Sequence, residues 1–162
     1  MGPVARSCAE VYAVGAYFDF AALRAESRPV PPSTPGAGAP CAFRIVLHTA
    51  LSREAYTAAI ADALAPRLAP HGDEGRAALE RFDALSARMP EQLPSGASLE
   101  VHLGSGGHVT LRADGATVGA VESAEPLCAA FRDIYLGADP ASPSLKDAVV
   151  ATMVATLGAG AA

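Results

Sequence analysis

The stretch that decides the fold covers residues 99–121 and reads LEVHLGSGGHVTLRADGATVGAV. Apolar and polar residues alternate over 99–103 and again over 109–112, and a third strand-like segment covers 117–121. Alternation with a period of two is typical of antiparallel strands that have one buried and one solvated face. Asp114-Gly115, between the second and third segments, favours a two-residue type I′ hairpin turn. The stretch therefore predicts three antiparallel strands.

Two further strands are predicted nearer the N-terminus. The first covers residues 8–18, which are rich in β-branched and aromatic side chains. Asp19 is the expected cap of a short apolar turn over 20–23. The second strand covers 42–48, whose apolar residues Phe43, Ile45, Val46 and Leu47 suggest burial on both faces. Between them, the proline-rich segment 26–41 is predicted to form a surface loop or a small disordered insert.

Two helices are predicted in the middle of the chain. Ser52 is a good N-cap for the first of them. Its apolar stripe is made of Tyr56, Ile60 and Leu64. The second helix covers residues 75–89, which are apolar on one side and charged on the other, and Pro90 ends it.

The last third of the chain predicts two more helices, joined by a polar turn. One starts behind Ser123, with Pro126 in its first turn and Gly137 at its end. The other starts behind the Ser142-Pro143 pair, and residues 158–162 are expected to fray. Its apolar stripe is made of Leu145, Val149, Met153 and Leu157. Antiparallel strands with segregated helices indicate the α+β class, as a single domain over residues 1–157.

Composition narrows the classes of function. The net charge is −5 and the charges are dispersed, which argues against a nucleic-acid partner because such surfaces need clustered Lys and Arg. No window of about 18 uninterrupted apolar residues is present, so no membrane span is predicted. Cys8, Cys41 and Cys128 are far apart and form no CxxC pair, which indicates reduced, buried thiols.

Three sequence features that suggest chemistry have simpler explanations. The glycine-rich segment 104–107 precedes a strand and not a helix, so a hairpin loop is a better interpretation than a phosphate site. His102 and His108 flank this loop, but no further ligand is placed to complete a metal site, and solvated histidines are expected. The tyrosines are interpreted from the residues alone as ordinary core or boundary side chains, with ligand binding left open. No cofactor or metal is predicted.

Four segments in order nevertheless resemble the chalcone isomerase family. They are residues 11–17, residues 44–47 leading into 51–56, residues 94–98, and residues 135–146. The resemblance covers most of the chain. It implies the family's open-faced β-sandwich, in which an antiparallel sheet is covered on one face by a layer of helices.

The family has two main branches, which differ in what the cleft does. True chalcone isomerases add a phenolate oxygen across an enone within one molecule, without a cofactor. Related plastid and bacterial proteins bind fatty acids in the equivalent cleft and have no known reaction. In both branches an arginine on the first strand of the cleft faces the ligand, where it stabilises the enone oxyanion in one branch and the carboxylate in the other.

Carried over residue by residue, the resemblance favours the binding branch. Tyr56 matches the family's cleft tyrosine and would be the catalytic residue if the chain were an isomerase. Tyr12 stands where true isomerases have threonine, as in the fatty-acid binders. Ala63 replaces an asparagine, and Ile134 and Tyr135 replace a Thr-Met pair. These replacements imply a more apolar pocket than a polyphenol requires.

The resemblance thus implies non-catalytic binding of a fatty acid or similar amphipathic small molecule. Arg6 is the local candidate for the carboxylate, with Tyr12 as a donor beside it. Tyr56 would line the mouth, and Ile134 and Tyr135 the apolar wall. The alternatives are a chalcone–flavanone isomerase (an intramolecular lyase acting on a polyphenol) and a non-binding accessory protein of a partner enzyme. No targeting segment is visible, so cytoplasm or plastid (chloroplast) stroma is expected, and the oligomeric state is not predicted.

Overall fold

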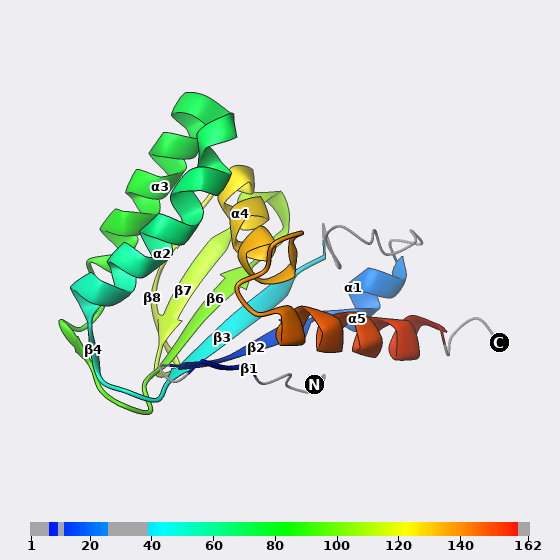
Figure 1. Cartoon of the computed structure of the whole chain (residues 1–162). Helices are drawn as coiled ribbons and strands as arrows, with labels where there is room; N and C mark the ends of the chain where they lie inside the picture. The colour runs from blue at the N-terminus through cyan, green and yellow to red at the C-terminus, as the bar shows by residue number, and fades with distance from the viewer. Residues whose placement is uncertain (1–6, 10–11, 26–38, 159–162) are drawn as a thin grey trace.

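The fold is built on one antiparallel sheet with helices along one side of it (Figure 1). The computed structural model describes residues 7–9, 12–25 and 39–158. The strands are β1 (Ser7–Ala9), β2 (Tyr12–Phe18), β3 (Cys41–Leu47), β4 (Leu51–Ser52), β5 (Gln92–Leu93), β6 (Ser98–Leu103), β7 (Val109–Ala113) and β8 (Ala116–Val121). The helices are α1 (Phe20–Ala25), α2 (Arg53–Leu68), α3 (Gly72–Ser86), α4 (Glu125–Leu136) and α5 (Pro143–Gly158), with short 3-10 turns η1 (Ala69–His71) and η2 (Ser105–Gly107).

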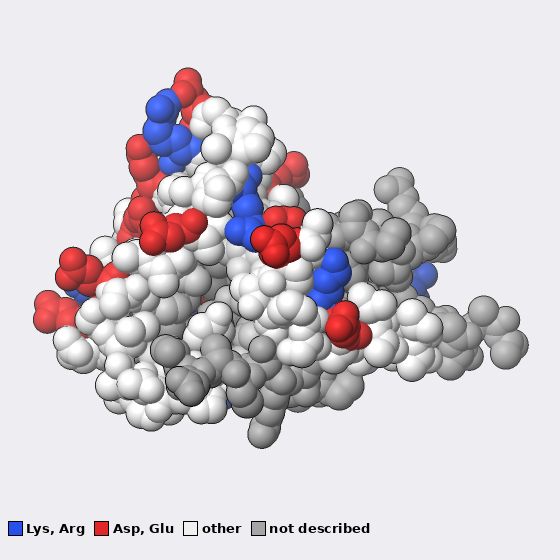
Figure 2. Space-filling model, in the orientation of Figure 1, with Lys and Arg blue, Asp and Glu red and all other residues white. Residues whose placement is uncertain are grey.

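The main sheet has six strands in the order β1-β2-β3-β6-β7-β8, and every neighbouring pair is antiparallel. The short strands β4 and β5 form a separate pair. Helices α2 to α5 lie along one face of the main sheet (Figure 1), which confirms the predicted α+β class. On the helix-covered side of the molecule, acidic and basic side chains are interspersed (Figure 2). None of the described helices is both long and apolar enough to cross a membrane.

Alternating burial places the core between the sheet and the helices. Over residues 99–103 of β6 and 109–112 of β7 the apolar residues are buried and the polar ones are partly exposed, as predicted. The prediction that β3 is buried on both faces is wrong. Phe43 and Ile45 are buried on the helix side, whereas Arg44 is exposed on the other face. The uncovered face explains this difference, because only half of the side chains of β3 meet a second layer.

The single strand predicted over residues 8–18 is also wrong. It consists of two antiparallel strands, β1 and β2, in which Ala9 lies opposite Tyr12 and Ser7 lies opposite Val14. No proline or Asn-Gly signal marks this reversal in the sequence, and the strand-forming residues continue through it. Residues 10–11 lie outside the described part of the chain.

The helices in the middle of the chain follow their predicted apolar stripes. Ser52 caps α2, since its side chain accepts a hydrogen bond from the backbone N–H of Ala55 at 3.1 Å. The buried residues of α2 are Tyr56, Ile60, Leu64 and Leu68. Helix α3 covers Gly72–Ser86 and therefore starts and ends three residues before the predicted range of 75–89. Asp73 and Glu74 explain the earlier start, because acidic side chains stabilise the first turn of a helix.

Helix α4 starts differently from the prediction, since Ser123 does not cap it. The N-cap residue is Ala124, which has no side-chain cap, and Ser123 has a φ of 52°. The backbone N–H of Ala124 instead donates to the carbonyl oxygen of Gly107 at 2.9 Å. The start of α4 is thus held by the β6–β7 loop. Gly137 ends α4 as predicted.

Helix α5 has the predicted cap, because the Ser142 side chain accepts from the N–H of Leu145 at 3.2 Å. Its described stripe residues Leu145, Val149 and Met153 are buried. The side chain of Leu157, residues 26–38 of the proline-rich segment and residues 159–162 of the predicted tail lie outside the described part.

Both predicted hairpin connections are present. Asp114 and Gly115 have φ values of 47° and 81°, as a type I′ turn requires, and Ala113 lies opposite Ala116. Residues 104–107 join β6 to β7 and contain η2, so they form a hairpin loop and not a phosphate-binding loop before a helix.

Gly107 is predicted to be essential for stability, with Gly106 as a matched control. Both have positive φ, but a Cβ on Gly107 would lie 2.5 Å from the backbone nitrogens of Ala124 and Glu125, whereas a Cβ on Gly106 would meet nothing within 4 Å. Gly106→Ala is expected to cost about 1–2 kcal/mol in the free energy of unfolding, and Gly107→Ala about 2–5 kcal/mol, because the clash adds to the backbone strain. Urea denaturation measures both, and equal costs would contradict this account.

Candidate functional site

Three of the predicted ligand-binding residues, all tyrosines, come together between the sheet and the helices. Tyr12, on β2, lies directly opposite the buried Leu47 and therefore faces the helix layer. Tyr56 comes from the first turn of α2, and Tyr135 from the last turn of α4. Burial raises the pKa of Tyr135 well above its ordinary value, and the neighbouring phenols of Tyr56 and Tyr12 raise it further. The three phenols, which are far apart in the sequence, therefore form one cluster.

The hydroxyl of Tyr56 is the unusual member of this cluster. The residue is 4% exposed, and its hydroxyl oxygen has no hydrogen-bond partner among the described residues. Burial raises the pKa of Tyr56, and the nearby phenol of Tyr12 adds to the increase. A buried polar group without a partner costs about 1–3 kcal/mol, so proteins seldom keep one without a reason.

Apolar side chains surround the phenols. The ring of Tyr135 packs on that of Phe43, with centroids 4.7 Å apart and planes tilted by 32°. Ile134 is buried next to Tyr135 on α4. Ala63, on α2, packs against the same core. Tyr135 and Ile134 thus belong to the apolar core, and Ala63 packs against it.

Arg6, the predicted partner of a carboxylate, lies outside the described residues. The structure draws attention to a different arginine, Arg132 on α4, which is buried. Its Nη2 donates to the carbonyl oxygen of Ala39 at 2.6 Å. Sequence reasoning missed this residue, although a signal was available. Arg132 follows Cys128 by four residues and precedes Tyr135 by three, so it falls on the apolar stripe of its helix.

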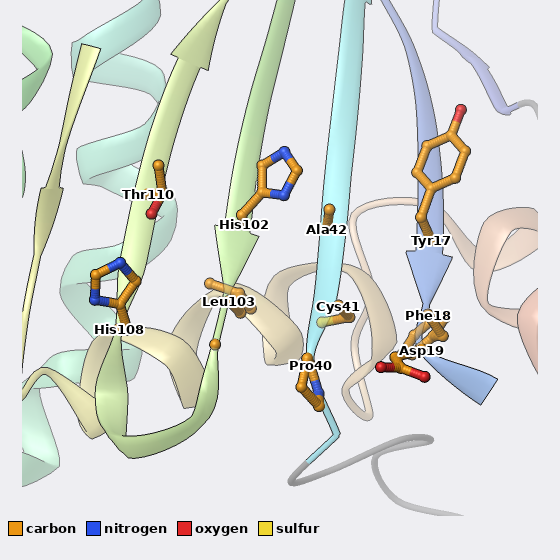
Figure 3. A pocket seen from close by; sticks show the side chains of 11 residues that line it. Tyr17, Phe18, Asp19, Pro40, Cys41, Ala42, His102, Leu103, His108 and Thr110 are labelled. Carbon is orange, nitrogen blue, oxygen red and sulfur yellow. The ribbon is translucent and has the colours of Figure 1, made fainter. Parts of the chain in front are cut away.

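Two cavities with fully described linings lie away from the tyrosine cluster. One, of about 470 Å³, lies where the ends of β2, β3, β6 and β7 meet, and Tyr17, Ala42 and His102 line it (Figure 3). The other, of about 250 Å³, lies between α3 and β8. Neither is lined by Tyr12, Tyr56, Ile134 or Tyr135.

The two histidines that flank the β6–β7 loop each have an acidic neighbour. His102 Nε2 lies 2.7 Å from Glu100 Oε2, and His108 Nδ1 lies 3.8 Å from Glu122 Oε1. Arg44 also approaches Glu100, at 3.8 Å, from the neighbouring strand. Within residues 7–9, 12–25 and 39–158, no three His, Cys, Asp or Glu side chains gather as a metal site would require.

Comparison with solved structures identifies the fold. The chain is similar to the crystal structure of a fatty-acid binding protein of Arabidopsis thaliana, with a TM-score of 0.76 and 18% sequence identity. The match covers 91% of this chain and 80% of that one. The chain therefore has the chalcone-isomerase-like fold that the resemblance implied. No protein-family model and no curated protein matches the chain.

Removal of the Tyr56 hydroxyl is predicted not to destabilise the protein. Tyr56→Phe is expected to leave the free energy of unfolding unchanged or raise it by up to about 1 kcal/mol, because an unpartnered buried polar group is lost and the ring is kept. Tyr17→Phe, on the opposite face of β2, is the control and is expected to change it by no more than about 0.5 kcal/mol. Urea denaturation at neutral pH measures both. A loss above about 1 kcal/mol in Tyr56→Phe would indicate a partner for the hydroxyl.

The buried phenols also predict a loss of stability in alkali. The pKa values of Tyr56 and Tyr135 are raised in the folded chain, so the unfolded chain releases these protons first as the pH rises. Their stabilising contribution is therefore complete below about pH 10, the ordinary pKa of tyrosine, and decreases above it. Urea denaturation at a series of alkaline pH values should show this decrease, and it should be smaller in Tyr56→Phe and Tyr135→Phe. A wild-type stability that stays constant across that range would rule the effect out.

Proposed function

We propose that this chain binds a fatty acid or a similar amphipathic small molecule between the sheet and the helices, without catalysing a reaction. The fold supports the proposal, because the solved structure that it resembles is that of a fatty-acid binding protein. The placement of Tyr12, Tyr56, Ile134 and Tyr135 supports it as well, since all four belong to the interface between the same two layers.

The observation that carries the proposal is the buried hydroxyl of Tyr56. This hydroxyl has no partner among the described residues, although it lies in a cluster with two other phenols. Such a site requires a hydrogen-bonding partner for the phenols and apolar contacts for the side chains around them. A ligand with a polar head group and an apolar chain provides both. The head group accepts hydrogen bonds from the phenols, and the chain replaces apolar contacts between the layers.

The energetics of such binding depend mainly on the apolar chain. Each buried methylene group contributes roughly 0.8 kcal/mol, so a chain of ten or more carbons provides most of the affinity. Hydrogen bonds from Tyr12 or Tyr56 add a smaller amount and fix the orientation. The expected ligand is therefore defined by its shape and its single polar end more than by specific polar contacts.

The isomerase alternative needs polar groups that this chain lacks. The resemblance places threonine, asparagine and a Thr-Met pair around the polyphenol in true isomerases, where this chain has Tyr12, Ala63, and Ile134 with Tyr135. Tyr56 alone matches. A cleft with this composition holds an alkyl chain better than a hydroxylated ring system.

Direct binding of cis-parinaric acid, a fluorescent polyunsaturated fatty acid, tests the proposal. Its fluorescence is expected to rise on titration with the protein. Tyr12→Phe should weaken binding by about 3- to 10-fold, which corresponds to the loss of one hydrogen bond. Tyr17→Phe, which changes the same strand on its other face, should not weaken it.

Two results would contradict the proposal. One is the absence of any fluorescence change with the wild-type protein, supported by native mass spectrometry that finds no co-purified lipid. The other is conversion of a chalcone by the protein faster than the uncatalysed reaction, measured as a decrease in the absorbance of the chalcone. This result would favour the isomerase alternative.

A further inference from the structure

The face of the sheet that the helices leave uncovered carries a row of side chains that the proposed function does not use. Tyr17, Ala42, His102 and Thr110 lie side by side on β2, β3, β6 and β7, because each is paired with the next in the strand register. On β3, β6 and β7 the residues before and after these positions are buried, whereas the row itself is partly exposed. The row therefore points away from the helices.

The cavity of about 470 Å³ is lined by this row. Tyr17 and His102 stand on the strands to either side of Ala42 (Figure 3). Ala42 projects only a methyl group, so the floor of the cavity is lowest between the two rings. Neighbouring strands lie about 5 Å apart, so a flat ring over Ala42 is within the roughly 4.5–7 Å at which aromatic rings attract one another on both sides.

The imidazole of His102 is oriented by a carboxylate. Its Nε2 lies 2.7 Å from Oε2 of Glu100, two residues earlier on the same face of β6. Arg44 and Arg112, on the strands to either side, each approach the same carboxylate at 3.8 Å. An ionised carboxylate only accepts hydrogen bonds, so Nε2 carries the proton, and in the neutral ring Nδ1 is an acceptor. The described residues form no hydrogen bond with Nδ1.

The rest of the lining favours an uncharged ligand. Among the described residues that line the cavity, none is Lys or Arg, so no fixed positive charge is available for an anion. The carboxylate in the lining belongs to Asp19, whose Oδ1 already accepts from the backbone N–H groups of Ala21 and Ala22 at 2.9 and 3.1 Å. Phe18, Pro40 and Leu103 add apolar contacts at the end of the sheet.

We infer that this cavity is a second binding site, for an uncharged planar aromatic molecule that carries one hydroxyl or N–H donor. The ring lies over Ala42, between Tyr17 and His102, and its donor binds Nδ1 of His102. This site goes beyond the proposed function and does not depend on it. The tyrosine cluster lies on the helix-covered side of the sheet, so the two sites can be occupied at the same time.

The test compares 2-naphthol, which has a ring system and one donor, with 2-methoxynaphthalene, which lacks the donor. Fluorescence anisotropy at about pH 8, where free imidazole is mostly neutral, measures binding to the full chain. The chain has no tryptophan, so the naphthalene signal is free of tryptophan emission. His102→Phe keeps a ring and loses the acceptor. It is expected to weaken binding of 2-naphthol by about 3- to 10-fold and to change that of 2-methoxynaphthalene by less than about 2-fold.

Ala42→Ile tests the position of the ring, because a branched side chain fills the space between Tyr17 and His102. It is expected to weaken binding of both compounds by at least about 10-fold. Ala13→Ile is the matched control. It makes the same change on the same face of the sheet, opposite Val46 and outside the cavity, and should change neither affinity. If Ala42→Ile does not fold as judged by circular dichroism, the His102→Phe comparison decides.

Three results would overturn the inference. The first is an anisotropy of 2-naphthol that the wild type does not change at concentrations up to about 1 mM. The second is equal binding by the wild type and a folded Ala42→Ile, or an equal loss of both compounds in His102→Phe. The third is displacement of 2-naphthol by excess palmitic acid, which would place it between the sheet and the helices. Failure of the protein to bind cis-parinaric acid would instead contradict the proposed function and leave this site unaffected.

Discussion

The structure depends on the packing of α4 against the apolar face of the sheet. Nine of its residues are buried, from Pro126 to Leu136, and it contacts α2, α3, α5 and the β6–β7 loop. Its aromatic residues make two of the ring contacts of the core, Tyr135 on Phe43 and Phe131 on Phe82 at 5.1 Å. A helix enclosed in this way cannot move without opening the core. The side chains that it presents to the tyrosine cluster are therefore held in place by most of the fold.

The same enclosure makes every polar group on α4 costly. Asp133 avoids the cost, because its side chain is half exposed and pairs with Arg67 at the edge of α2. Arg132, one residue earlier, points into the core and has a backbone carbonyl as its described hydrogen-bond acceptor. The contrast between these two neighbours shows that polarity near the cluster is not a general property of the helix.

Most of the fold could be predicted from the sequence, because the elements that position the core carry local signals. Local signals predicted the hairpin strands and two helix starts correctly. They are the alternation in residues 99–112, the Asp114-Gly115 turn, and the Ser52 and Ser142 caps. The predictions failed where the decisive interaction lies between distant residues. The reversal between β1 and β2 has no turn residues to mark it, and the start of α4 is set by Gly107, seventeen residues upstream of Ala124.

The candidate site was less predictable, for a related reason. Tyr12, Tyr56 and Tyr135 come from three different elements, and only the resemblance to a family suggested that they meet. Nothing in the sequence says that the hydroxyl of Tyr56 lacks a described partner, because this depends on the side chains that surround it in three dimensions. A positive charge on the apolar stripe of α4 was visible in the sequence, but whether such a residue reaches solvent depends on tertiary packing.

The hydrogen bond between Gly107 and Ala124 has a consequence for how the chain folds. It closes a segment in which the antiparallel strands β6, β7 and β8 follow one another along the chain. The start of helix α4, which comes next, is bonded to the loop between β6 and β7. Contacts within this segment have small sequence separations, so little loop entropy opposes their formation. We expect this C-terminal half to assemble early and to act as the template on which β3 and β2, whose partners are more distant along the chain, are added afterwards.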